Sequence, residues 1–323
     1  MFGLALVVVC CVLLVSCSAR ASRMPVIGIL TMPGTPEQDA INLSFIDTSY
    51  AKFLHGGGAT VVPILFNSTS TEVENQMKTM DGVFFTGGMA MPDSFPRYYA
   101  TATLLYDLVI EQGKTLWGTC LGFQMINDIT AKQSILGEYP QMNVPLKLNF
   151  TSYGDKESKM YSHLGKDMKA LFTEHSFTEN WHNYGVGLDT FELYMEPMGF
   201  RAVSTNIDTN GKEFVSSLEH IEHRIYGTQW HPEANQYDPD PKGTSNIVHS
   251  TLATTAMNYM AEFLIQQANL SPKSGDADAD ANASGAKDHM LQGHQSCLPN
   301  AIELYPVRAV VTDEDTAFHY VFA

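Results

Sequence analysis

The stretch KTLWGTCLGFQMINDITA, Lys114 to Ala131, joins two different patterns at a single cysteine. KTLWGTC is a short apolar run typical of a buried strand, and LGFQMINDITA has the apolar spacing of a helix. Cys120 lies between them, with Gly118 and Gly122 on either side. This pattern is typical of a nucleophile elbow, a sharp strand-to-helix turn that exposes a catalytic side chain. The alternative is a small buried thiol between glycines that serve only close helix packing.

Strands and helices alternate on the N-terminal side of this stretch. Short apolar runs predict buried strands that begin at Met24, Thr60 and Asp81. Helical spacing predicts helices over residues 44–59, 71–80 and 100–113, the first with Tyr50 and Phe53 on one face. This alternation predicts an α/β fold with a mostly parallel central sheet and helices on both faces. Function in such sheets lies at the carboxyl ends of the strands, where Cys120 is expected.

The pattern changes to strand pairs from Val144 onward. RAVSTNIDTNGKEFVSSLEH, residues 201–220, is two β runs joined by Asn210-Gly211, a sequence typical of a β-hairpin turn. A long helix is expected over residues 250–268. We therefore predict one catalytic domain over residues 24–268, a solvated linker or loop over 270–300, and a C-terminal β extension of the same domain over 301–323.

The N-terminal residues 1–21 are an apolar run followed by small residues, which predicts a cleaved signal peptide. An uncleaved membrane anchor is the alternative. Five N-glycosylation sequons agree with entry into the secretory pathway, at Asn42, Asn67, Asn149, Asn269 and Asn282. We expect a lysosomal, vacuolar or extracellular glycoprotein. The formal charge of −16 disfavours nucleic acid and anionic membrane surfaces as partners.

After signal cleavage the chain keeps two cysteines, Cys120 and Cys297. A secreted protein that used cysteine for stability would carry more of them. A single disulfide between these two residues is the alternative to a free, reactive Cys120.

The stretch QWHPE, Gln229 to Glu233, supplies a second candidate site. If the segment is extended, the side chains of His231 and Glu233 project to the same side, so that the carboxylate could orient the imidazole. The alternative is a surface histidine at a strand end. The spacing lacks the H-E-x-x-H signature of zinc sites, and no metal is expected.

These motifs together resemble the class I glutamine amidotransferase-like proteins, which have a flavodoxin-like fold. The order FFTGG, WGTCLGFQ and YGTQWHPE carries the resemblance. The flanking segments PVIGILT, SYAKFLHGGGATVVP and ENWHNYGVGL are more closely similar to the γ-glutamyl hydrolase family, secreted and lysosomal cysteine peptidases that trim folate poly-γ-glutamates. The resemblance implies that Cys120 is the nucleophile, His231 the general base and acid, and Glu233 the residue that orients the imidazole.

The resemblance also implies positions that bind the substrate. The backbone N–H groups of Leu121 and of the Gly87-Gly88 turn would form an oxyanion hole. His182 matches a family histidine used in substrate binding or catalysis, and its alternative is a packed or exposed histidine. The family commonly has Glu at the position of Gln124, so a charge-based role is not carried over to that residue.

The resemblance implies hydrolysis of pteroyl poly-γ-glutamates through a thioester, with no cofactor and with a homodimer as the assembly. Glutamine and γ-linked glutamates share the same γ-carbonyl, so one apparatus could attack both. A polyanionic substrate of an acidic protein predicts a local cationic pocket, with Lys156, Lys159 and Arg97 as candidates. The rival functions are a hydrolase of another small γ-glutamyl amide, similar to a glutaminase, and a non-catalytic protein that binds folate or γ-glutamyl peptides.

Overall fold

The computed structural model describes residues 24–34, 43–90, 92, 94–238, 245–272, 309–312 and 318–322. The predicted signal peptide, most of the predicted linker and Cys297 lie outside the described residues. No helix in these ranges is long and apolar enough to cross a membrane. The predicted domain boundaries stay a prediction.

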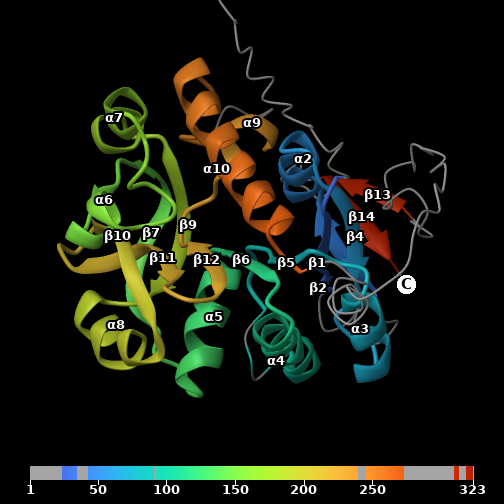
Figure 1. Cartoon of the computed structure of the whole chain (residues 1–323). Helices are drawn as coiled ribbons and strands as arrows, with labels where there is room; N and C mark the ends of the chain where they lie inside the picture. The colour runs from blue at the N-terminus through green and yellow to red at the C-terminus, as the bar shows by residue number, and fades with distance from the viewer. Residues whose placement is uncertain are drawn as a thin grey trace, which may run out of the picture.

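An eight-stranded sheet forms the centre of the molecule, in the order β4-β1-β5-β6-β12-β11-β10-β8 (Figure 1). Its strands are β1 (Val26–Leu30), β4 (Thr60–Ile64), β5 (Gly82–Phe85), β6 (Thr115–Thr119), β8 (Asn149–Phe150), β10 (Phe200–Ile207), β11 (Glu213–His220) and β12 (Arg224–Thr228). Neighbouring strands from β4 to β12 are parallel to each other. From β12 onward each strand is antiparallel to the one before it in this order. The predicted fold class, a mostly parallel sheet of the α/β type with added hairpins, is confirmed.

Helices pack on both faces of this sheet (Figure 1). One apolar core lies beneath α2 (Thr48–Gly56), α7 (Lys166–Glu174) and α10 (Thr251–Asn269). The other lies beneath α3 (Ser70–Met77), α4 (Pro96–Glu111), α5 (Leu121–Ala131) and α8 (Leu188–Tyr194). Trp117 of β6 and Leu116 beside it face opposite cores, as the alternation of side chains along a strand requires.

The first predicted helix begins later than expected. Residues Ser44–Asp47 form strand β3, and α2 starts at Thr48 because the side chain of Asp47 caps it, accepting from the Ser49 N–H at 2.8 Å. β3 belongs to a second sheet of order β13-β14-β3-β2, with β2 (Met32–Pro33), β13 (Ala309–Thr312) and β14 (Phe318–Phe322). The C-terminal strands thus pair with a strand near the N-terminus rather than with the central sheet.

The second half of the chain contains the predicted hairpin and several helices that the sequence did not indicate. β10 and β11 pair antiparallel on either side of Asn210-Gly211, which confirms the hairpin. The short helices are α6 (Ser152–Lys156), α8, η1 (Glu196–Met198) and α9 (Ala234–Tyr237), and α7 is longer. β7 (Gly137–Leu146) and β9 (Thr178–Gly185) form a separate two-stranded sheet.

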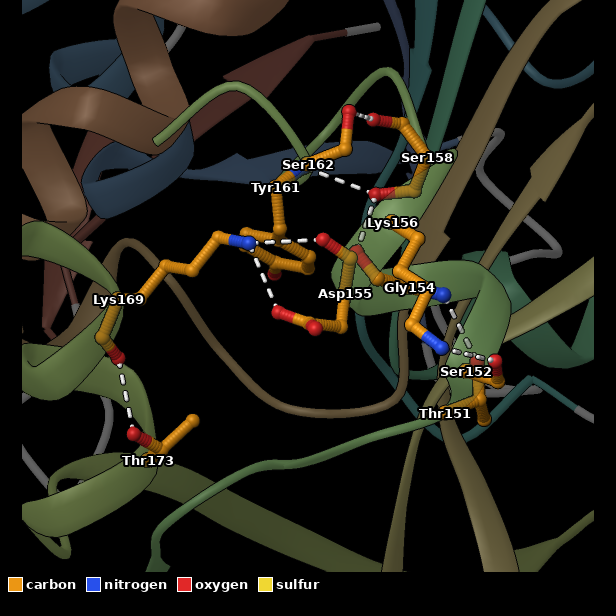
Figure 2. A network of polar contacts seen from close by, with 10 residues as sticks. All are labelled: Thr151, Ser152, Gly154, Asp155, Lys156, Ser158, Tyr161, Ser162, Lys169 and Thr173. Atoms are coloured by element: carbon orange, nitrogen blue, oxygen red, sulfur yellow. Dashed lines mark hydrogen bonds and ion pairs between the residues drawn. The ribbon is translucent and has the colours of Figure 1, made fainter. Parts of the chain in front are cut away.

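A network of polar contacts attaches α6 to α7 (Figure 2). The Thr151 hydroxyl caps α6 by accepting from the Gly154 N–H at 2.9 Å. Lys169 of α7 donates to the Asp155 carbonyl at 2.7 Å and to its carboxylate at 2.8 Å. The Ser158 hydroxyl donates to the Gly154 carbonyl at 2.9 Å. These bonds join α7 to α6, and α6 packs against β10.

We expect a Gly154→Ala variant to be destabilised by about 1–3 kcal/mol. A Cβ at this position would lie 1.9 Å from the Val203 carbonyl oxygen, so the helix and β10 must move apart. Without that contact, Ala in place of a helical Gly would stabilise the protein by about 0.5–1 kcal/mol. Thermal or denaturant unfolding measures the sign of the change in stability. Gly165→Ala places the same methyl group in open space and is the control. Unchanged stability of Gly154→Ala would show that this contact is loose.

Candidate active site

Cys120 lies on a strained turn between β6 and α5. Its backbone has φ 51° and ψ −102°, a conformation that costs a non-glycine residue about 1–3 kcal/mol. A Cβ on Gly122 would lie 2.3 Å from the Phe85 carbonyl oxygen, and a Cβ on Gly118 would lie 2.5 Å from the Gly122 carbonyl carbon. Both flanking glycines are therefore required for β5, β6 and α5 to meet, and Cys120 is a free thiol.

His231 and Glu233 lie beside this turn, in the loop that follows β12. The His231 Nδ1 atom is 2.7 Å from a Glu233 carboxylate oxygen. The two residues are not on one extended strand, which corrects the prediction. β12 ends at Thr228, and Glu233 has the helical φ of −75° at the start of α9. The contact is made by a turn, and the His231 N–H donates to the Glu179 carbonyl at 2.8 Å to fix it.

The charges around His231 favour its protonated form. Burial by itself lowers the pKa of His231, but the negative charges of Glu233 and of the Cys120 thiolate raise it, and the net pKa lies well above its ordinary value. Because Nδ1 is held by Glu233, the other ring nitrogen, Nε2, is left for the Cys120 thiol, and hydrogen bonding to that thiol also raises the pKa of His231. This arrangement can sustain a thiolate–imidazolium pair.

The structure adds Tyr50 to the site, a residue that sequence reasoning placed only on the buried face of a helix. Its hydroxyl accepts from the Gly87 N–H at 3.0 Å and lies 3.4 Å from His231 Nδ1. Burial and then the charges of Glu233 and Cys120 raise the pKa of Tyr50 well above its ordinary value, so the hydroxyl stays neutral. Tyr50 thus connects the glycine turn after β5 to the imidazole.

We expect Tyr50→Phe to lower kcat about tenfold and to leave KM nearly unchanged, because the Gly87 turn loses the hydrogen bond that holds it. Steady-state kinetics measure kcat and KM separately. The matched control is Tyr98→Phe, since the Tyr98 hydroxyl is buried without a hydrogen-bond partner within the described ranges. A Tyr50→Phe enzyme with wild-type kcat would exclude this positioning role.

The three predicted oxyanion donors are not equivalent. The Gly87 N–H is already bonded to Tyr50, whereas the hydrogen bonds of the described residues do not use the N–H groups of Gly88 and Leu121. Leu121 is the first residue of α5, and its N–H belongs to the positive end of the helix dipole. Gly88 and Leu121 can therefore receive a developing negative charge on oxygen.

A pocket of about 520 Å³ opens above Cys120. It brings together most of the residues predicted from the sequence: Gly88, Cys120, Leu121, Gln124, His182 and His231. It adds residues that were not predicted: Met89, Met142, Trp181, Asn183 and Tyr184. The Cys120 Sγ atom lies 3.8 Å from the Trp181 carbonyl oxygen. The β7–β9 sheet therefore forms one wall of the pocket.

His182 and Gln124 are both uncharged in this pocket. Burial, followed by the positive charge of His231, lowers the pKa of His182 to about 3, so its imidazole is neutral. Neither ring nitrogen of His182 has a hydrogen-bond partner in the described part of the chain. The Gln124 amide donates to the Tyr184 carbonyl at 2.7 Å and to the Gln229 side chain at 3.3 Å. Gln124 therefore attaches α5 to β9.

The prediction that Lys156, Lys159 and Arg97 supply positive charge to the pocket is wrong. Lys156 lies on α6, where its ammonium is 3.5 Å from the Ser152 hydroxyl (Figure 2). Lys159 donates to the carbonyls of His220 and Ile221, and Arg97 to that of Asn67. None of these cations lines the pocket. In the described ranges no group of three or more His, Cys, Asp or Glu side chains is arranged to hold a metal ion.

Comparison with known proteins agrees with this geometry. Residues 45–250 match the family model described as glutamine amidotransferase class-I. The "Gamma-glutamyl hydrolase B" of Dictyostelium discoideum is 31% identical over 257 residues, which cover 76% of this chain and 72% of that protein. The human "Gamma-glutamyl hydrolase" is 30% identical over 255 residues, covering 76% and 78%. A solved glutaminase domain of Trypanosoma brucei CTPS with bound acivicin has the same fold, with TM-score 0.51, 13% identity, and coverage of 77% and 95%.

The sheet order, the cysteine elbow and the His–Glu pair define a domain of the class I glutamine amidotransferase type. The relatives share about 30% identity over three quarters of the chain, from slime mould to human. Within this class the chain belongs to the γ-glutamyl hydrolase family, as the motifs indicated.

Proposed function

We propose that this chain is a cysteine hydrolase that cleaves the γ-glutamyl bonds of pteroyl poly-γ-glutamates. The observation that carries the proposal is that Cys120 and His231 line one pocket, with Glu233 bonded to His231, in a chain of the γ-glutamyl hydrolase family. Cys120 sits on a strained turn and lines the pocket, and a buried carboxylate holds the imidazole of His231. This is the arrangement of a nucleophile, its base and the orienting group of that base.

The reaction proceeds in two acyl-transfer steps. The Cys120 thiolate attacks the γ-carbonyl carbon, and the N–H groups of Gly88 and Leu121 receive the resulting oxyanion. The carbon–nitrogen bond breaks as protonated His231 donates its proton to the leaving amine, which leaves a thioester on Cys120. His231 then takes a proton from water, the hydroxide attacks the thioester, and the free carboxylate and the Cys120 thiolate are released.

The test is hydrolysis of pteroyl-penta-γ-glutamate by the purified mature protein at acidic and neutral pH, beside a γ-linked diglutamate and free glutamine. We expect shortened pteroyl products and little ammonia. Faster release of ammonia from glutamine would replace this proposal with an amidase of the glutaminase type. Binding of the pteroyl compound without any product would instead support the non-catalytic binding protein.

We also propose that the protein passes through the secretory pathway, to a lysosome or vacuole or to the outside of the cell. Two of the sequon asparagines, Asn149 and Asn269, are exposed, as glycan attachment requires. The test is treatment of the protein from eukaryotic cells with a glycosidase that removes N-linked glycans. We expect a loss of apparent mass, which should be smaller in an Asn149→Gln variant. Sizing of the deglycosylated protein by light scattering tests the proposed homodimer.

A further inference from the structure

Among the residues that the structure describes, the pocket at Cys120 has no charged side chain other than those of Cys120 and His231. None of these lining residues is Lys, Arg, Asp or Glu. Its polar groups are the amides of Gln124 and Asn183 and the neutral imidazole of His182. The whole chain carries a formal charge of −16. Moving several carboxylates into this pocket would cost several kcal/mol, because the one cation in its described lining, the His231 imidazolium, is already paired with Glu233 and the Cys120 thiolate.

Large apolar side chains form the rim of this pocket. Met142 and Trp181 are directly opposite each other in the β7–β9 pair, and they are 46% and 44% exposed. Tyr184 and Met89 are 43% and 91% exposed. We call these four residues the apolar rim. Exposed apolar groups gathered around a concave site are typical of a ligand-binding surface, and Met and aromatic side chains bind flat rings well.

The apolar rim begins next to the nucleophile. The Trp181 carbonyl oxygen is 3.8 Å from the Cys120 Sγ atom, so the indole extends from a residue that touches the reacting sulfur. Trp181 and Cys120 line the same pocket, so a ring held on the indole can belong to the same substrate molecule as the carbonyl under attack. In a pteroyl poly-γ-glutamate, one glutamyl unit separates the aromatic end from the first γ-linked bond.

We propose that the apolar rim is the subsite for the aromatic pteroyl end of the substrate, and that Cys120 is therefore presented with a γ-glutamyl bond close to that end. This inference rests on the proposed function. The uncharged ring system stacks on Trp181, beside its cross-strand partner Met142. The carboxylates of the outer glutamates stay in solvent, where the acidic protein does not desolvate them. The first products are pteroylglutamate or its diglutamate together with the remaining poly-γ-glutamate as one piece.

The experiment compares pteroyl-penta-γ-glutamate with N-acetyl-penta-γ-glutamate, which lacks the aromatic group. We expect Trp181→Ala to raise KM for the pteroyl substrate about tenfold with little change in kcat, and to leave KM for the acetyl substrate unchanged. Trp181→Phe keeps a ring and should restore most of the affinity. Leu193→Ala, which removes an exposed side chain on α8 that does not line the pocket, is the control.

Binding is also measurable without turnover. Trp181 is the exposed one of the three tryptophans, since Trp117 and Trp230 are fully buried. Pteroic acid should therefore quench the tryptophan fluorescence of the wild type but not that of Trp181→Phe. Equal KM increases for both substrates, or free glutamate as the first product, would overturn the inference. Hydrolysis of neither substrate by the wild type would instead defeat the proposed function.

Discussion

A Cys120→Ala variant is expected to lose hydrolysis of pteroyl-penta-γ-glutamate by at least about ten-thousand-fold. The reason is that the proposed mechanism passes through a thioester, and the described pocket contains no other nucleophile of comparable reactivity. Alanine removes the sulfur and keeps the Cβ, so the turn with φ 51° bears the same strain in the variant as in the wild type. Single-turnover hydrolysis with products separated by chain length measures the loss.

Two control measurements on this variant, its thermal stability and its substrate binding, show whether the fold and the pocket are intact. Thermal unfolding should be close to that of the wild type, and the variant should still bind the substrate, since the Gly88 and Leu121 N–H groups and the apolar rim remain. Iodoacetamide should inactivate the wild type, and substrate should slow that inactivation. If Cys120→Ala kept a tenth of the activity, water would have to attack the bound substrate directly, and the covalent mechanism would be excluded.

The elbow could be predicted from the sequence because its cause is local. Gly118 and Gly122 are needed where a strand turns into a helix at close range, and their spacing around Cys120 is visible in the chain. The distances of 2.3 and 2.5 Å at which added Cβ atoms would meet neighbouring backbone give the physical reason. The alternation of strands and helices predicted the sheet in the same way, because the spacing of apolar residues within each segment distinguishes a strand from a helix.

Other features of the site depend on contacts between distant segments. The sequence placed Tyr50 on one face of its helix with Phe53, and both are buried, but the bond from Gly87 to Tyr50 joins residues 37 positions apart. The apolar rim depends on the register of β7 and β9, which pairs Met142 with Trp181. The extended form predicted for the QWHPE segment was wrong because Pro232 and the start of α9 turn the chain. A one-dimensional pattern contains no information on any of these pairings.

A Glu233→Gln variant is expected to lower kcat about 10²- to 10⁴-fold while substrate binding changes little. The carboxylate accepts from His231 Nδ1 at 2.7 Å and is 3% exposed, so its charge acts on the imidazole through little water. Glutamine has the same shape but can present its NH₂ group to Nδ1, which favours the wrong ring tautomer. The nitrogen that should serve the thiol then carries the proton in the neutral form of the ring.

The pH profile of this variant tests the electrostatic argument directly. The negative charge of Glu233 raises the pKa of His231, so its removal lowers that pKa. The protonated imidazole, which stabilises the thiolate and protonates the leaving amine, is lost as the pH rises through the His231 pKa. The alkaline limb of kcat/KM should therefore move to lower pH in Glu233→Gln, whereas Glu192→Gln, an exposed carboxylate on α8, should leave it in place. An alkaline limb that does not move would show that another group controls it, and that Glu233 acts only by positioning the ring.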